Sequence, residues 1–175
     1  MQAWADKHPE YRLHIPALPV DPLAAMQQLE SIVAAMAQPL GVIGSSLGGF
    51  FANVLAARYG LAAVLINPAV HPHRLLKKYV GVQANYHTGV ATEVRSEHFD
   101  FLENIEVSPP HPERLNVLLE TGDETLDYRE AAQFYAACSL EITEGGSHAY
   151  EGFAEKLPRI IAFLHEASAK KLAYV

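Results

Sequence analysis

The stretch Gly44-Ser45-Ser46-Leu47-Gly48-Gly49 decides the fold of this 175-residue chain. It lies between an apolar run at residues 40–43 and a helical pattern at residues 47–59. A Gly-x-Ser-x-Gly sequence at such a junction is typical of a sharp strand-to-helix turn that projects the serine hydroxyl outward. We expect glycine two residues before and two after the serine, because side chains there would collide as strand and helix fold together. The bare pattern is common, so its position is what makes it informative.

Outward from this turn, short apolar runs alternate with longer helical patterns. This alternation predicts βαβ units and a mainly parallel sheet within a single domain over residues 1–175. Asp21 is the expected N-cap of the first helix, with Pro22 at its first position. The expected strands cover residues 11–15, 40–43, 62–66, 115–119 and 140–143, and the expected helices cover residues 22–36, 47–59, 128–137 and 155–169.

The pattern loosens between residues 70 and 114, which contain one helical piece near 74–79 and then a polar stretch. An irregular insertion of this length in a compact domain is usually a functional lid or loop. Within it, Tyr79, Tyr86 and Phe99 are candidates to line a substrate pocket. They could equally serve only to pack the insertion onto the core.

Two further loops supply chemical partners for Ser46. Asp123 directly follows the fourth expected strand, and His148 follows the fifth after a pair of glycines. Because parallel strands end at one edge of a sheet, the three side chains are expected to converge there. We predict Ser46 as nucleophile, His148 as general base and Asp123 as the acid that orients the imidazole. The N–H of Leu47, at a helix N-terminus, is the predicted oxyanion donor.

Other interpretations of these residues stay open. The glycine turn could bind a phosphate, although no lysine follows it as in a P-loop and no GxGxxG spacing is present. Asp127 could replace Asp123 as the acid, but it precedes a helical run and suits an N-cap. His71 and His73 resemble a metal-binding pair, but no third ligand is spaced to join them, so we predict no metal site.

Composition narrows the classes of function. The net charge is −7 and the pI is about 5.7, with no basic stripe, which argues against a nucleic-acid-binding protein. The lone cysteine, Cys138, is expected to be a structural thiol. The N-terminus lacks an apolar signal core, and no run reaches the roughly 18 apolar residues of a membrane span. We therefore expect a cytoplasmic protein with no membrane span.

Taken together, the motifs resemble the YqiA-like esterases of uncharacterised-protein family 0227, which are small bacterial α/β-hydrolases. The resemblance implies an α/β-hydrolase fold, a three-layer α/β/α sandwich with a small lid insertion. It also implies a serine carboxylesterase that hydrolyses short acyl esters through an acyl-enzyme and needs no cofactor. An acyl-CoA thioesterase with the same triad, or an impaired hydrolase fold that binds a partner, are alternatives. The matching stretches are residues 43–50, 67–70, 121–124, 126–129 and 144–150.

The chain departs from this resemblance at its N-terminus. Family members begin with a strand ending in His-Gly-Phe, ahead of the helix in which Met1 falls here. That strand would lie in the middle of the sheet, and its following loop would donate a second oxyanion N–H. We expect a truncated chain that is weakly active or poorly stable, since losing one such donor costs about 100- to 1,000-fold in rate.

Overall fold

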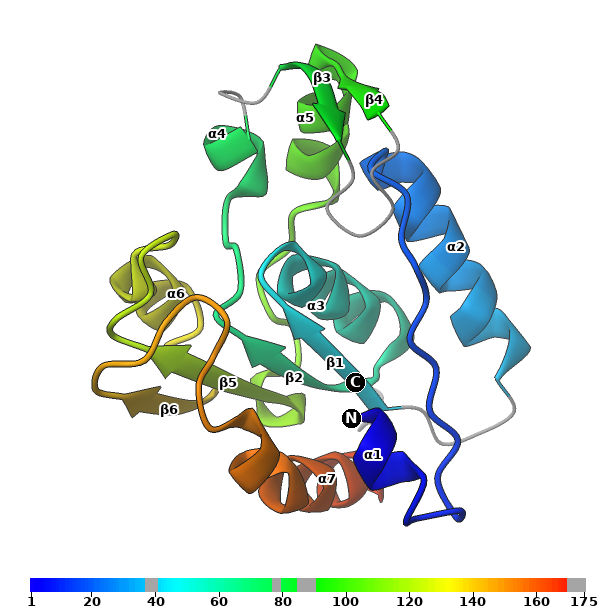
Figure 1. The fold of residues 1–175 in the computed structure, drawn as a ribbon, viewed down its shortest axis with the longest axis vertical. Helices are drawn as coiled ribbons and strands as arrows, with labels where there is room; N and C mark the ends of the chain where they lie inside the picture. Colours follow the sequence, from blue (N-terminus) through cyan, green and yellow to red (C-terminus); the bar gives the residue numbers. More distant parts are fainter. Residues whose placement is uncertain (37–40, 77–79, 85–90, 170–175) are drawn as a thin grey trace.

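A four-stranded parallel sheet forms the centre of the protein, with the order β1-β2-β5-β6 (Figure 1). The computed structural model describes residues 1–36, 41–76, 80–84 and 91–169. The predicted parallel sheet is confirmed, and β2 is buried along its whole length, as its unbroken apolar sequence indicates. The strands are Gly41–Ser45 (β1), Ala62–Ile66 (β2), Leu115–Glu120 (β5) and Ser139–Thr143 (β6).

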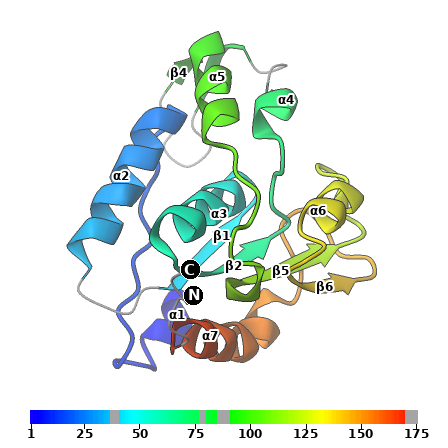
Figure 2. The ribbon, with the colours of Figure 1, turned by 180° about the vertical axis from the view of Figure 1, so that it is seen from behind.

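Helices cover both faces of this sheet, so the predicted three-layer sandwich is confirmed. Figures 1 and 2 show α3 (Leu47–Tyr59) and α7 (Phe153–Ala169) on opposite sides of the strands. Successive side chains of β2 point to opposite faces of the sheet, so they pack alternately against the two helical layers. Ala63 and Leu65 pack in the cluster that includes α3 and α6 (Tyr128–Phe134). Val64 and Ile66 pack in the cluster that includes α7. The short α1 (Gln2–Ala5) lies beside α7.

The helix α2 (Pro22–Ala35) begins where the sequence predicts. The carboxylate of Asp21 accepts hydrogen bonds from the N–H groups of Leu23 at 2.8 Å and Ala24 at 3.3 Å. These bonds satisfy two of the donors that a helix leaves unpaired in its first turn. On its inner side, Ala25 and Met26 pack against α3 in a third cluster of the core. The helix α3 is thus covered both by the sheet and by α2.

The insertion contains more regular structure than the sequence indicates. It holds α4 (Pro72–Leu76), an antiparallel pair of strands, β3 (Gly81–Ala84) and β4 (Ala91–Val94), the helix α5 (Ser96–Ile105) and a short 3-10 turn, Pro112–Arg114. The prediction of an irregular polar stretch is wrong for α5, which buries Phe99, Leu102 and Ile105. Acidic residues alternate with the apolar ones along α5, so the segment has a polar average composition although one face of the helix is apolar. Of the helical piece expected at 74–79, residues 77–79 lie outside the described residues.

The strand expected at residues 11–15 is also wrong. Residues 12–19 form no strand, and β1 lies at the edge of the sheet, with β2 as its neighbour. An extended segment becomes a strand only when a partner accepts its hydrogen bonds, and Pro16 and Pro19 cannot donate to a ladder. Apolar character alone therefore does not place this segment in the sheet.

No helix within the described ranges is long and apolar enough to cross a membrane.

Cys138 lies between α6 and β6 and packs against the core cluster of α3, β5 and α6. Burial, and to a smaller extent the negative charge of Glu113, raises the pKa of Cys138 to about 11. Disulfide exchange requires the thiolate, whose fraction falls tenfold for each unit by which the pKa rises above the solution pH. This environment agrees with the expected structural thiol.

We therefore expect Cys138 to react slowly with a disulfide reagent such as DTNB at pH 8. In urea the thiol returns to its ordinary pKa, near 9, and about 100-fold more of it is ionised than at a pKa of 11. Because a thiolate of higher pKa is also a stronger nucleophile, the folded chain should react at least about 10-fold more slowly than the unfolded chain, measured by absorbance of the released thiolate. Equal rates in the two states would contradict this description of the site.

Candidate active site

Ser46 occupies the turn between β1 and α3, with φ 55° and ψ −123°. A positive φ is unfavourable for a residue with a side chain, so surrounding contacts must hold it. The Ser46 N–H donates to the carbonyl of Ile66 at 3.0 Å. The Ser46 carbonyl accepts from the N–H groups of Gly49 at 2.9 Å and Ala69 at 3.1 Å. The end of β2 thus holds the turn from one side, and the first turn of α3 holds it from the other.

Close backbone contacts explain part of the glycine pattern. A Cβ at Gly44 would lie 2.1 Å from the carbonyl oxygen of Gly48, and a Cβ at Gly49 would lie 2.8 Å from Cβ of Pro68. At Gly48 itself, a Cβ would meet nothing within 4 Å. The expectation that glycine is sterically required two residues after Ser46 is therefore wrong. The requirement falls one residue later, where α3 crosses the segment after β2.

The structure brings Ser46, His148 and Asp123 together at the carboxyl edge of the sheet. Nε2 of His148 lies 3.0 Å from Oγ of Ser46. Nδ1 of His148 lies 2.9 Å from Oδ2 and 3.0 Å from Oδ1 of Asp123. A carboxylate can only accept, so Nδ1 carries the proton and the lone pair of Nε2 faces the serine hydroxyl. Such a pair can remove the hydroxyl proton as the serine attacks an electrophile.

The carboxylate of Asp123 is almost fully buried, since its side chain is 2% exposed. It also accepts hydrogen bonds from the N–H groups of Thr125 at 2.8 Å and Leu126 at 2.9 Å. These bonds satisfy a charge that would otherwise be costly to bury. Asp127, the alternative acid, instead caps α6 by accepting from the N–H of Arg129 at 3.0 Å. The imidazole of His148 is therefore paired with Asp123.

The loops that carry Asp123 and His148 touch each other directly. The Gly122 N–H donates to the carbonyl of Gly145 at 2.7 Å. A Cβ at Gly122 would lie 2.4 Å from the carbonyl oxygen of Gly146, so only glycine permits this approach. The backbone N–H of His148 donates to the Glu124 carboxylate at 2.9 Å, and this bond lowers the pKa of Glu124.

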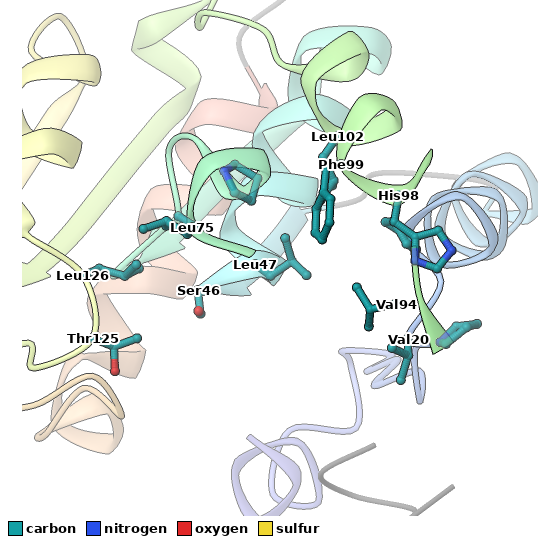
Figure 3. Close-up of a pocket in the computed structure, with 14 residues that line it drawn as sticks. Val20, Ser46, Leu47, Leu75, Val94, His98, Phe99, Leu102, Thr125 and Leu126 are labelled. Atoms are coloured by element: carbon teal, nitrogen blue, oxygen red, sulfur yellow. The ribbon is translucent and has the colours of Figure 1, made fainter. Parts of the chain in front are cut away.

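A cavity of about 430 Å³ opens beside Ser46, and its lining is mainly apolar. Figure 3 shows Ser46 between Thr125 and Leu126 on one side and Leu47 and Phe99 on the other. The size is typical of a small-molecule site. Leu47 also lines this cavity, and its N–H stands in the first turn of α3, where a helix provides no internal acceptor.

Residues 1–165 match the Uncharacterised protein family UPF0227. The chain belongs to this family. The match extends from α1 to α7 and includes the turn of Ser46 and both loops that meet it. The family assignment made from the sequence motifs is thus confirmed.

Solved structures similar to this UPF0227 chain share its architecture. Est1E from Butyrivibrio proteoclasticus, solved with ferulic acid bound, has a TM-score of 0.63 at 16% identity. The match covers 85% of this chain and 69% of the Est1E chain. Mouse alpha/beta hydrolase domain-containing protein 10 has a TM-score of 0.60 at 18% identity, with coverages of 82% and 69%. The monoacylglycerol lipase of Paleococcus ferrophilus has a TM-score of 0.57 at 15% identity, and the match covers 87% of this chain and 77% of the lipase. The UPF0227 chain therefore has an α/β-hydrolase fold.

Of the three predicted pocket residues, Phe99 lines the cavity and is 4% exposed. Tyr79 and Tyr86 lie outside the described residues. Sequence reasoning missed several lining residues, which come from the segment before α2, from β4 and from α5. Their positions in the sequence carry no shared motif, because only packing of the insertion against α2 and α3 brings them together. They include Val20, Val94, His98 and Leu102.

His71 and His73 both face Glu106 at the end of α5. Nδ1 of His71 lies 2.8 Å from one carboxylate oxygen, and Nδ1 of His73 lies 3.2 Å from the other. These contacts join α4 to the end of α5. Within the part of the chain that the structure describes, no three His, Cys, Asp or Glu side chains are placed to hold a metal ion.

The two glycines of the serine turn should respond differently to alanine. Gly44→Ala forces a Cβ against the backbone of Gly48, and such overpacking should lower the free energy of unfolding by about 3 kcal/mol. For a chain of this size the melting temperature should fall by roughly 6–12 °C. Gly48→Ala is the matched control, because its Cβ meets open space and alanine favours a helix by up to about 1 kcal/mol. Thermal unfolding followed by circular dichroism measures both, and equal losses would refute the steric argument.

Proposed function

We propose that this UPF0227 chain is a serine carboxylesterase that hydrolyses short acyl esters with Ser46, His148 and Asp123. The observation that carries the proposal is the position of the His148 imidazole, with one ring nitrogen 3.0 Å from the serine hydroxyl and the other 2.9 Å from a buried carboxylate. The fold supports the same chemistry, because it is shared with proteins named as an esterase and a lipase.

In the proposed reaction, Ser46 Oγ attacks the ester carbonyl carbon while Nε2 of His148 takes its proton. Asp123 stabilises the imidazolium that forms, and the Leu47 N–H donates to the tetrahedral oxyanion. The C–O bond to the alcohol then breaks, and His148 returns the proton to the leaving oxygen. Water, deprotonated by His148, attacks the resulting acyl-enzyme. The bond between the acyl carbon and Ser46 Oγ then breaks, His148 returns the proton to Oγ, and the carboxylic acid leaves. Nucleophile, base and acid are all side chains, so these steps use no cofactor or metal.

The cavity defines the kind of substrate that we propose. Its volume of about 430 Å³ admits a small ester, and its apolar wall includes Phe99 and Leu102. Apolar lining favours an alkyl or aryl group over a charged one, because burying an unpaired charge is costly. We propose that the acyl group lies along this wall, with its carbonyl between Ser46 and the Leu47 N–H.

Replacing the nucleophile gives the first test. Ser46→Ala should reduce kcat for p-nitrophenyl butyrate at least about 1,000-fold and abolish labelling by a fluorophosphonate probe, because both reactions need the serine oxygen. Release of p-nitrophenol and in-gel fluorescence measure the two effects. The melting temperature of the variant should match that of the parent chain. Wild-type hydrolysis or labelling by Ser46→Ala would end the proposal.

The two aspartates provide a sharper comparison. Asp123→Asn should lower kcat by about 10,000-fold, because an amide presents a donor to Nδ1 and favours the wrong imidazole tautomer. Asp127→Asn is the matched control. Asparagine also caps helices well, and Asp127 contacts Arg129 rather than His148, so the rate should change less than about threefold. If Asp127→Asn lowered kcat more than Asp123→Asn, Asp127 would be the acid that orients His148.

A further inference from the structure

Two buried polar residues beside the site are not used by the proposed reaction. Asn67 directly follows β2, and Glu120 is the last residue of β5; each is 2% exposed. Polar groups are buried at a cost unless hydrogen bonds satisfy them. Their partners therefore indicate what they do, and most of those partners belong to the loop that carries His148.

Glu120 binds the backbone on both sides of His148. Its Oε2 accepts a hydrogen bond from the N–H of Ser147 at 2.9 Å and another from the N–H of Glu151 at 3.0 Å. The loop closes tightly over this carboxylate, since a Cβ at Gly146 would lie 2.1 Å from Oε2. The N–H groups one residue before and three residues after His148 are thus anchored to a strand of the sheet.

Asn67 binds the carbonyl groups of the same loop. Its Nδ2 donates to the carbonyl of Ser147 at 3.1 Å and to that of His148 at 3.3 Å. Its Oδ1 accepts from the backbone N–H of Glu120 at 3.0 Å, which aligns the amide. Asn67 itself has φ 39°, a conformation that asparagine tolerates better than most residues.

The segment after β2 also contacts the nucleophile. Two residues beyond Asn67, the Ala69 N–H donates to the carbonyl of Ser46 at 3.1 Å. A single short segment therefore holds the turn of Ser46 through its backbone and the loop of His148 through the side chain of Asn67. This arrangement connects the two groups that must lie within hydrogen-bonding distance of each other.

The loop needs such support because of its composition. Gly145 and Gly146 have φ of 79° and 73° and no side chains to pack, so fixing them costs more backbone entropy than fixing other residues. His148 is itself 23% exposed in its side chain. The Gly122 N–H, the Thr121 hydroxyl and the Glu124 carboxylate each hold the loop by one hydrogen bond. Asn67 and Glu120 add four more, all at residues 147, 148 and 151.

We propose that Asn67 and Glu120 are positioning residues that hold the His148 loop at the correct distance from Ser46. The inference rests on the proposed function for its effect on rate, and on the contacts above for its effect on structure. A displacement of about 1 Å at a reacting group can cost about 100-fold in rate. Losing this clamp should therefore affect kcat much more than KM.

The first test replaces Asn67 by its isostere. Asn67→Asp keeps an acceptor for the Glu120 N–H but loses both donors and sets a carboxylate against two carbonyl groups. Asn53→Asp is the matched control, because Asn53 is also 2% exposed and its Nδ2 donates to a distant carbonyl, that of Val107, at 2.7 Å. We expect Asn67→Asp to lower kcat about 100-fold with KM within threefold, whereas Asn53→Asp lowers kcat less than threefold.

A second readout does not depend on catalysis. In the clamped loop, the N–H at Nδ1 of His148 donates to the carboxylate of Asp123, and its proton should give a low-field NMR resonance. We expect that resonance in the parent chain and in Asn53→Asp, and its loss in Asn67→Asp. If the parent chain shows the resonance but reacts with no ester or fluorophosphonate, the proposed function fails while the clamp stands. If Asn67→Asp keeps both resonance and rate, the clamp fails.

Glu120 provides variants for the case in which Asn67→Asp does not fold. Glu120→Gln keeps a carbonyl oxygen that can accept both loop N–H groups, and should keep the resonance and at least a third of kcat. Glu120→Met has nearly the same shape without an acceptor, and should lose the resonance and about 100-fold in kcat. Equal behaviour of the two variants would overturn the proposal.

Discussion

The parallel alignment of the four strands is the constraint on which the whole site depends. Ser45 pairs with Ile66 at the ends of β1 and β2, and Glu120 pairs with Thr143 at the ends of β5 and β6, so the two strands of each pair end at the same level. Hydrogen bonding continues just past the strand ends, where the Ser46 N–H donates to the carbonyl of Ile66 at 3.0 Å. A slip of one residue in either pair would turn every side chain to the opposite face. The geometry at Ser46 is thus an extension of the sheet.

At that edge, backbone segments approach closely and leave polar groups that need partners. Gly44 and Gly122 allow contacts that a Cβ would block, at 2.1 Å and 2.4 Å. Carbonyl and N–H groups of the His148 loop are bound by the buried side chains of Asn67 and Glu120. Close packing and buried hydrogen bonding therefore act together.

The insertion gives the site its shape. Its helix α5 belongs to the core, because Leu102 and Ile105 pack with Phe50 and Val54 of α3. A rigid α5 also fixes the cavity wall, since Phe99 lies on the same helix. The side chains of Ser46, Asp123 and His148 lie in loops at the edge of the sheet, whereas much of the cavity wall comes from elements packed beside it. Changes in the insertion can accordingly alter what the cavity admits without moving Ser46.

Local patterns in the sequence determined the four strands of the sheet, the helices α2, α3, α6 and α7 and the loops that carry Ser46, Asp123 and His148. The strand-to-helix turn at Ser46, the cap at Asp21 and the parallel sheet all follow from short-range rules on glycine, proline and apolar spacing. The same rules also distinguish Asp123, the partner of His148, from Asp127, because a helix that begins at Tyr128 needs an N-cap and Asp127 provides it. These features depend on few neighbours, and those neighbours are close in the chain.

Tertiary structure alone decided the rest. Residues 11–15 have strand-like composition but form no strand, since a strand exists only with a partner that accepts its hydrogen bonds. Gly48 matches the motif but meets no obstacle, and the steric need falls on Gly49 because of a residue 19 positions away, Pro68. The clamp of Asn67 on the His148 loop joins residues about 80 positions apart. Contacts over such separations depend on how whole elements pack, which no local pattern encodes.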